Sequence, residues 1–514
     1  MKKRIIAFVL AGIMMLSLAA CSKSGGKVAK APDEPLTKED VIDVTILSNA
    51  SWPYNENWKV WEYIREEIGA TINVNAVPSS EYATKYPLMF AAPDTLPDVV
   101  AFDSKPATDK FAIQGAFIAL EDMQEYMPNY NAWLETLSDE DIENVVNIRK
   151  AYDGKIYYTP ATGREATRGV RCWLYRKDIF DKHGIAVPKT FDELYEACKK
   201  LKELYPESFP FAMRSGMTNL AVTGPSWKEY WAPGVYYDYI NEKWEFGARE
   251  EIMREMLEFY KKMVAEKLMP SDFMTMNTST WQELISTSRG FIFPEYQTRI
   301  NFFNTLAREQ NPDFNLTAMM PPVANKETGV ARVGRYNYET MGYVICNTGK
   351  EANMVNAAKY IDWFYSDKAM DLVSWGKEGE TYKTVNGKRE FISDETGTDV
   401  TLLYGFATFG SFLRIDPEST IAQLDEDTAA VIDFITDYAE PKFSPTANLA
   451  FNDEESKTIE ETNAACKTYS EEMMTKFILG QEPISGFDKY VETLNSMGVD
   501  KLLGAYESAY NRVK

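Results

Sequence analysis

The feature that most constrains the fold is an alternation of strand-like and helix-like hydrophobic periodicity near the start of the chain. Three segments have the patterns of buried or half-buried strands: 42–47, 71–77 and 96–102. Between them, segments 58–68 and 82–92 carry apolar side chains at helical spacing. This strand–helix–strand–helix–strand order predicts a parallel sheet with crossover helices.

The same alternation returns in the second third of the chain. Strand patterns are found at 172–176, 209–214, 290–296 and 342–348. The helix predicted after the first of these begins with Thr190 as N-cap and Glu193 three residues later, a capping-box pattern. Two C-terminal helices are predicted at 459–479 and 487–497, each followed by a glycine. Two α/β lobes fit this layout better than a row of independent domains.

The first forty residues predict a secretory signal followed by a site of membrane attachment. A basic MKKR start and an apolar run from Ile5 to Ala20 predict a signal peptide over 1–20, because the run is too short for a confident membrane span. Leu18-Ala19-Ala20-Cys21 resembles a bacterial lipobox, which implies cleavage before Cys21 and attachment of acyl chains such as palmitate. A plain signal peptide is the alternative. Residues 21–40 are small and polar, which predicts a flexible tether.

Charge and histidine content exclude several classes of function. The net charge is −22, and it becomes −25 once the first twenty residues, with three basic and no acidic side chains, are removed. Such a surface repels phosphate backbones, so we expect no nucleic-acid partner. His183 is the single histidine, which rules out two-histidine zinc sites within this chain. We interpret it as a helix-end residue beside a glycine turn.

Four cysteines remain in the mature chain: Cys172, Cys198, Cys346 and Cys466. Their wide spacing has no metal-ligand signature, and an even number outside the cell permits disulfides. Cys198 falls on the apolar stripe of a predicted helix, so we favour buried free thiols.

Catalytic motifs are few. The chain lacks phosphate-binding, nucleophile-elbow and calcium-loop motifs, and its two S-x-x-K occurrences have no partner motif. A pair of carboxylates for glycoside hydrolysis remains open, because sequence spacing does not give their separation in space. No cofactor is implied.

Aromatic residues make up 13% of the chain, and their rings can pack on the C–H faces of sugars. Trp52 and Tyr54 follow the first predicted strand, at the sheet edge where ligands of open α/β sheets gather. Trp227 and Trp231 lie in a stretch bounded by proline and glycine without apolar periodicity, which predicts a loop with exposed rings. Asp103 ends the third strand and is a candidate for binding hydroxyls. For each of these, packing within its own lobe is the alternative.

Several segments carry a family resemblance: FAAPDTLPDVVAFD (90–103), LYRKDIFDKHGIAVPKTFDELYEACKKLK (174–202), WGKEGETY (375–382) and residues 486–512. With the lipobox, they resemble the family 1 extracellular solute-binding proteins that serve carbohydrate ABC importers of Gram-positive bacteria. The resemblance implies an α/β, two-lobed, type II periplasmic-binding-protein-like fold with ligand held in an interlobe cleft. It implies hinge crossings near 157–160, 293–296 and 336–343.

These crossings predict the division into lobes. The N-lobe is expected to hold 41–158 and about 291–340, and the C-lobe 159–290 and about 341–514. The lobe assignment of 383–450 stays open, because that segment matches the family less clearly.

The same resemblance adds candidate ligand contacts. Trp375 and Glu378 lie in the WGKEG loop, which by resemblance faces the cleft. Arg164 and Arg168 follow the first crossing, and Tyr296 lies at the second. Guanidinium groups there can reach ligand hydroxyls or a carboxylate.

We therefore expect a monomeric, lipid-anchored receptor on the extracellular face of the cell membrane. It captures a carbohydrate, an oligosaccharide in our interpretation, and delivers it to ABC permease subunits without catalysing a reaction. Three alternatives remain open: a secreted carbohydrate-active enzyme with a carboxylate pair, a receptor of the same fold for a peptide or another non-sugar solute, and a surface adhesion or sensor lipoprotein without a permease partner.

Overall fold

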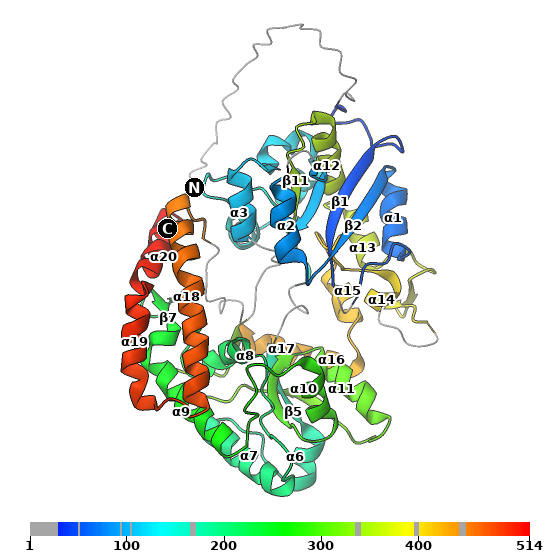
Figure 1. Cartoon of the computed structure of the whole chain (residues 1–514). Coiled ribbons are helices and arrows are strands. Elements are labelled where there is room, and N and C mark those ends of the chain that lie inside the picture. The colour runs from blue at the N-terminus through cyan, green and yellow to red at the C-terminus, as the bar shows by residue number, and fades with distance from the viewer. Residues whose placement is uncertain are drawn as a thin grey trace, which may run out of the picture.

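The computed structural model describes residues 29–49, 52–92, 95–102, 105–164, 171–334, 341–394, 400–440 and 449–513, which form two lobes (Figure 1). Each lobe has its own hydrophobic core. Buried residues between 42 and 161 and between 341 and 415 pack together in the first lobe. Those between 172 and 333 and between 435 and 509 form the core of the second. The predicted two-lobed α/β fold is confirmed.

The first lobe is built on a five-stranded sheet with the order β2-β1-β3-β11-β4. β1 (Val41–Ser48) pairs in parallel with β2 (Thr71–Pro78) and with β3 (Val99–Phe102), as the alternating pattern predicts. β11 (Gly342–Cys346) runs antiparallel between β3 and β4 (Phe117–Ile118), so a late segment of the chain completes an early sheet.

Helices cover both faces of this sheet (Figure 1). In α1 (Lys59–Ile68), the predicted apolar stripe is buried, and Gly69 ends the helix with φ 73°. The remaining helices of this lobe are α2 (Tyr82–Phe90), α3 (Lys105–Ile113), α4 (Pro128–Leu134), α5 (Asp139–Asp141), α12 (Glu351–Trp363), α13 (Asp367–Ser374), α14 (Val400–Tyr404) and α15 (Pro417–Ala422). A hairpin of β12 (Tyr382–Val385) and β13 (Lys388–Phe391) lies beside α13.

The second lobe contains a three-stranded antiparallel sheet in the order β8-β5-β9. Its members are β8 (Ile292–Tyr296), β5 (Arg171–Arg176) and β9 (Leu316–Met319). The strand predicted at 209–214 is reduced to one bridge, between Phe211 and Ile292. Two smaller pairs accompany the sheet: β6 (Val235–Asp238) with β7 (Lys243–Phe246), and β10 (Val333–Gly334) with β14 (Ala439–Glu440).

Helix α7 (Phe191–Leu204) begins after the N-cap residue that the sequence predicts. Thr190 Oγ1 accepts a hydrogen bond from the Glu193 N–H at 3.2 Å, which confirms the N-cap. The Glu193 carboxylate accepts from the backbone N–H of Lys189 rather than Thr190. The other helices of this lobe are α6 (Lys177–His183), α8 (Gly216–Thr223), α9 (Glu251–Ala265), α10 (Thr278–Ser286), α11 (Arg299–Arg308), α16 (Glu426–Ala429) and α17 (Ile432–Tyr438).

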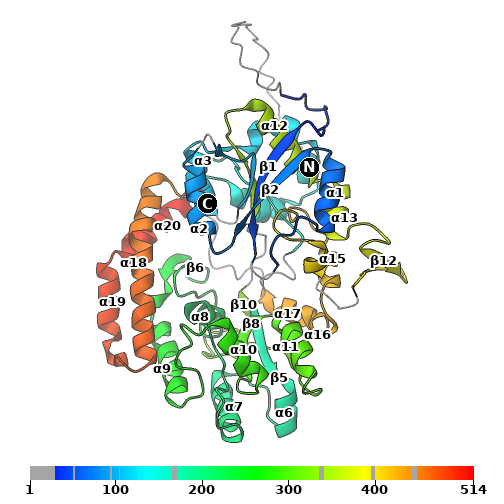
Figure 2. The same cartoon turned by 45° about the vertical axis from the view of Figure 1, so that its right-hand side comes forward.

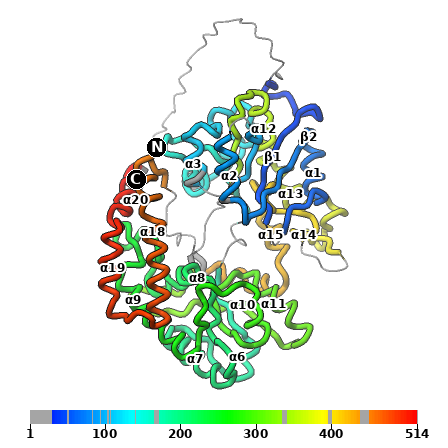
Figure 3. Tube along the Cα trace, viewed as in Figure 1, coloured from blue at the N-terminus to red at the C-terminus, as the bar shows by residue number. Residues whose placement is uncertain are grey.

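Three C-terminal helices pack side by side against α9 and β7: α18 (Asp453–Ile478), α19 (Phe487–Ser496) and α20 (Val499–Val513) (Figure 3). They also reach the first lobe. Lys110 Nζ of α3 lies 2.8 Å from Glu460 Oε1, and the Arg512 guanidinium lies 5.0 Å from the centre of the Tyr152 ring. These helices therefore span both lobes on one side of the molecule.

The predicted division into lobes is wrong after residue 290. β8 and β9 pair with β5, so the segment 291–334 belongs to the second lobe. β11 pairs with β3, so 342–415 belongs to the first lobe. The resemblance implies a second crossing at 293–296, but these residues lie in β8, which pairs with β5 inside the second lobe. The described chain instead passes between the lobes within 158–171, 334–342 and 415–427.

The tether predicted at 21–40 is also too long. From Lys30 onward the chain packs on the first lobe: Lys30 Nζ pairs with Glu34 and Asp40, at 2.9 and 3.3 Å. Lys359 of α12 donates to the carbonyls of Pro32 and Glu34. Cys21 and the signal peptide lie outside the described residues.

The cysteine and histidine interpretations are confirmed. All four cysteines between 172 and 466 are buried free thiols. His183 ends α6 before Gly184, and its Nε2 lies 2.9 Å from the Tyr205 hydroxyl. No helix in the described part of the chain is long and apolar enough to cross a membrane.

Candidate ligand-binding site between the lobes

In both sheets, the strand ends that carry predicted ligand-binding residues face the opposite lobe. In Figure 2, β1 and β2 run down toward the second lobe, and β5 runs within the second lobe, from the side that faces the first lobe down toward α6. The loop after β1 and the first residues of β5 therefore lie on the sides where the lobes face each other. Because β8 is antiparallel to β5, with Arg171 opposite Tyr296, the end of β8 lies on this side as well.

On the first lobe, the loop after β1 carries two of the predicted aromatic residues. Trp52 is half-buried, and so is Tyr54. The Tyr54 ring packs edge-on against Trp58 and Trp61, with centroids 6.3 and 5.7 Å apart, and its N–H donates to Ser48 Oγ. A hollow of about 570 Å³ opens beside this loop, lined by Pro53, Tyr54, Asn55, Glu56, Asn57, Trp58 and Leu402. The loop thus combines ring faces with amide and carboxylate groups.

Arg164 lies at the start of the first crossing and is 6% exposed. Its guanidinium donates to the carbonyl of Ala407 and lies 5.1 Å from the centre of the Phe412 ring. It therefore fastens the segment 407–412 to the crossing, a structural contact within the first lobe. Arg168 and Asp103, the other two polar candidates near this edge, lie outside the described residues.

On the second lobe, Tyr296 is half-buried beside Arg171. The Arg171 guanidinium lies 4.3 Å from the centre of the Tyr296 ring, and its Nη2 donates to the Tyr296 hydroxyl at 3.2 Å. Its Nη1 donates to Asn219 Oδ1 of α8 at 2.7 Å. Arg171 was not among the sequence candidates, because it begins a largely apolar strand and only the sheet register brings it opposite Tyr296.

The neighbouring residue Glu295 is completely buried and is surrounded by arginines. Its Oε1 lies 2.8 Å from Arg214 Nη2 and 3.8 Å from Arg171 Nη1, and its Oε2 lies 3.5 Å from Arg299 Nε. These residues come from β8, β5, the start of α11 and the turn before α8. No sequence pattern links them, since they are up to 128 residues apart and meet only in the folded lobe.

Three predicted aromatic contacts are buried instead of exposed. Trp375 is 2% exposed: its ring stacks on Phe391 with centroids 4.8 Å apart, and its Nε1 donates to Asp416 at 2.7 Å. Trp227 and Trp231 are 6% and 2% exposed within the second core. Their rings are covered by protein, so the prediction of exposed rings at these positions is wrong in this structure. Glu378 is exposed on the loop after Trp375.

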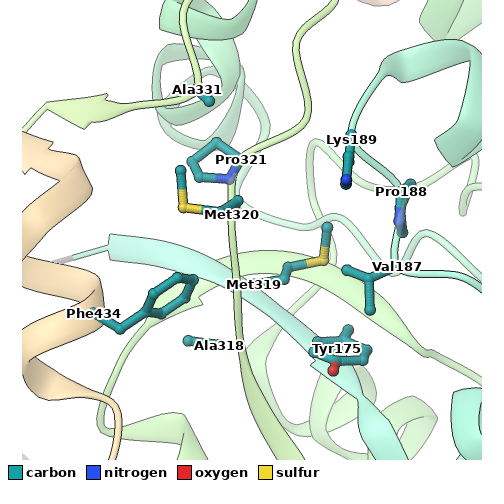
Figure 4. Close-up of a pocket in the computed structure, with 10 residues that line it drawn as sticks. All are labelled: Tyr175, Val187, Pro188, Lys189, Ala318, Met319, Met320, Pro321, Ala331 and Phe434. Atoms are coloured by element: carbon teal, nitrogen blue, oxygen red, sulfur yellow. The ribbon is translucent and has the colours of Figure 1, made fainter.

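A second hollow, of about 460 Å³, lies on the second lobe and is almost entirely apolar. Tyr175, Val187, Met319, Met320 and Phe434 surround it, with Lys189 at its border (Figure 4). A sugar needs hydrogen-bonding partners for its hydroxyls, which this lining does not supply. In the described part of the chain, no three His, Cys, Asp or Glu residues gather as a metal site would require.

Comparison with known proteins decides the family. The family model of the bacterial extracellular solute-binding proteins matches residues 59–371, which is more than half of the chain. This chain belongs to that family.

Two relatives of this solute-binding protein match it from end to end. Lipoprotein LipO of Bacillus subtilis (strain 168) is 24% identical over 100% of this chain and 99% of its own length. The polygalacturonan/rhamnogalacturonan-binding protein YtcQ of the same organism is 22% identical with the same coverage.

Solved structures show the same fold. The alginate-binding protein AlgQ2 superimposes with a TM-score of 0.72 at 21% identity, over 94% of this chain and 100% of its own. The S. pneumoniae ABC-transporter substrate-binding protein FusA, in complex with kestose, superimposes with a TM-score of 0.73 at 18% identity, over 92% and 99%. The family and these neighbours are binding proteins.

Proposed function

We propose that this solute-binding protein is a lipid-anchored extracellular receptor that captures an oligosaccharide between its lobes and delivers it to an ABC importer. The observation that carries the proposal is the arrangement of two α/β lobes, joined by three crossings, whose facing sheet ends bear aromatic and polar side chains. Ligands of open α/β sheets bind at such strand ends. Hinge movement at the crossings would then close the lobes around the ligand.

The chemistry of the facing edges supports a sugar ligand. The half-buried Trp52 and Tyr54 on one lobe and Tyr296 on the other supply ring faces, and the neighbouring asparagines and arginines supply hydrogen-bond donors. Sugars use both, since their C–H faces pack on rings and their hydroxyls pair with polar groups. The ligands of the relative YtcQ and of the structural neighbours AlgQ2 and FusA, namely polygalacturonan, alginate and kestose, are all carbohydrates.

Binding without turnover is also part of the proposal. Glu295, next to Tyr296 at the end of β8, is held in ion pairs with Arg171, Arg214 and Arg299. Its oxygens are engaged by these guanidinium groups and its side chain is completely buried, so it is not free to pass a proton to a glycosidic oxygen.

The test is a thermal-unfolding screen of the chain from residue 22, expressed without its lipid, against neutral and acidic oligosaccharides and with peptides as controls. A ligand at a hundred times its Kd stabilises the native state by about 2.7 kcal/mol, which raises the midpoint measurably. We expect a shift with an intact oligosaccharide and no product after overnight incubation. Product formation would support an enzyme, and a shift with peptides alone would contradict the carbohydrate ligand.

The anchor has its own test. Replacement of Cys21 by Ala in the full chain removes the sulfur to which acyl chains attach, so we expect the protein to move from the membrane fraction to the medium. Membrane retention of the variant would contradict lipid anchoring at this residue.

A further inference from the structure

The second-lobe edge of the proposed site holds more positive charge than its own carboxylate can balance. Three guanidinium groups, from Arg171, Arg214 and Arg299, lie within 3.8 Å of the single carboxylate of Glu295. Among the residues that the structure describes, the local excess is two positive charges, in a chain whose net charge is −22. A basic cluster of this kind, largely removed from water, is unusual on so acidic a protein.

The cluster retains donors for a further anion. Among the described residues, no group accepts a hydrogen bond from the Nη atoms of Arg299, and the buried Nε of Arg214 also has no acceptor. The three side chains keep 16%, 10% and 23% of their surface exposed, in the order Arg171, Arg214 and Arg299. A molecule arriving at this edge can therefore reach them.

The surroundings favour an anion over a neutral group. Burial lowers the pKa of Arg214, and the charges of Arg299 and Arg171 lower it further, while Glu295 opposes the change. The guanidinium groups thus repel one another in a poorly hydrated setting, where charges interact more strongly than in water. A second carboxylate relieves this repulsion, and arginine binds carboxylates through two parallel hydrogen bonds.

The arginine cluster lies beside Tyr296, which is a predicted ligand contact. Arg171 is the first described residue after the first crossing, and it packs on the ring of Tyr296 at the end of β8. A sugar stacked on the exposed part of Tyr296 places its ring substituents beside the same guanidinium groups.

We propose that Arg171, Arg214 and Arg299 bind the carboxylate of a uronate residue, so that the ligand is an acidic oligosaccharide. This inference rests on the proposed function, because it names the substrate class of the same site. Glu295 then acts as a positioning residue that holds the three arginines together. A neutral sugar leaves the excess charge unbalanced and binds more weakly.

Isothermal calorimetry tests the proposal with trigalacturonate and trimannuronate, each beside its neutral counterpart, galactotriose or mannotriose. We expect at least one uronate trimer to bind at least tenfold more tightly than its neutral counterpart, with an affinity that falls as salt concentration rises. Equal affinity for both members of a pair, or binding of neutral trimers only, overturns the charge inference and leaves the oligosaccharide receptor intact. Binding of peptides and of no sugar overturns both.

Single-residue variants test whether the arginine cluster causes the preference for uronates. Arg299→Gln is chosen because Arg299 is the most exposed of the three, and it should weaken uronate binding about tenfold while neutral sugars keep their affinity. Arg289→Gln, an exposed arginine of the same lobe that pairs with Glu283, is the matched control and should change nothing.

Glu295→Gln removes the balancing charge but keeps a side-chain oxygen that can accept hydrogen bonds from the arginines and hold them in place. It should therefore tighten uronate binding several-fold, a gain that a merely structural role does not give. Circular dichroism confirms that each variant is folded. Unchanged uronate affinity in both folded variants, or tighter binding of a sulfated oligosaccharide than of any uronate, contradicts the proposed carboxylate site.

Discussion

Buried carboxylates give individual residues a pH dependence that can be measured. Asp362 of α12 is 5% exposed, and burial raises the pKa of its carboxyl to about 6, although the Tyr130 N–H and Asn129 Nδ2 donate to it at 2.9 and 2.7 Å. In the unfolded chain the same group titrates near 3.8. The folded state therefore holds this proton more tightly, and its free energy of unfolding falls as pH rises between these two values.

Asp362→Asn removes this titration. We expect the free energy of unfolding of the variant, relative to the wild type, to rise by on the order of 2 to 3 kcal/mol between pH 3.5 and pH 7. Urea unfolding at several pH values measures the difference. A difference between Asp362→Asn and the wild type that does not vary with pH would contradict the raised pKa.

Gly163 fixes the start of the first crossing through its backbone. Its φ is 103°, and a Cβ there would lie 1.7 Å from the Ile415 carbonyl oxygen, so the two segments approach more closely than any side chain allows. We predict that Gly163→Ala lowers the free energy of unfolding by at least about 2 kcal/mol more than Gly154→Ala. Gly154 also has a positive φ, 82°, but has open space around it. This control therefore measures the cost of a positive φ without the steric clash. Equal losses in urea unfolding would contradict the close approach.

At the residue scale, the sequence predicts part of the site. Trp52 and Tyr54 follow β1, and Tyr296 ends β8, because these positions follow from strand patterns that can be read locally; their contact with a ligand stays a prediction. Burial of Trp375 and Trp231 depends on the partners that cover them, which no local pattern reveals. The arginine cluster around Glu295 depends in the same way on long-range register.

At the scale of single elements, the start of a helix can be predicted from its N-cap residue. Thr190→Ala removes the side-chain acceptor for the Glu193 N–H at the start of α7, and we expect a loss of about 1 kcal/mol in the free energy of unfolding. Thr190→Ser keeps the hydroxyl and should retain most of the stability in the same urea experiment. If both variants lose the same amount, the methyl group rather than the cap is responsible.

Elements themselves are predicted better than their partners. β1, α1, β2, α7 and α19 lie where their periodicity and glycine stops place them. The segment 209–214 has a strand pattern but forms one bridge, because no neighbouring strand lies in register along it. Apolar alternation reports which side chains are buried, and pairing depends on geometry far along the chain.

The division of the whole molecule could not be predicted from the sequence for the same reason. β8 and β11 are both short apolar strands, yet they complete sheets in different lobes. The sequence of each strand is compatible with either sheet. Which sheet a strand joins depends on where the chain has crossed between the lobes. Relatives that match from end to end support the architecture, but the local patterns alone do not order the crossings.

Two separate cores predict how the whole molecule unfolds. The described contacts between the lobes are few and exposed, such as Lys110 with Glu460, which contributes at most about 1 kcal/mol. Without ligand, each core therefore unfolds with limited coupling to the other, and the ratio of van't Hoff to calorimetric enthalpy should fall below about one. A ligand that contacts both facing edges joins the lobes, so the same calorimetric scan with a bound oligosaccharide should raise the ratio as well as the midpoint. A single two-state transition without ligand would show instead that the crossings and the helices α18 and α20 already couple the lobes fully.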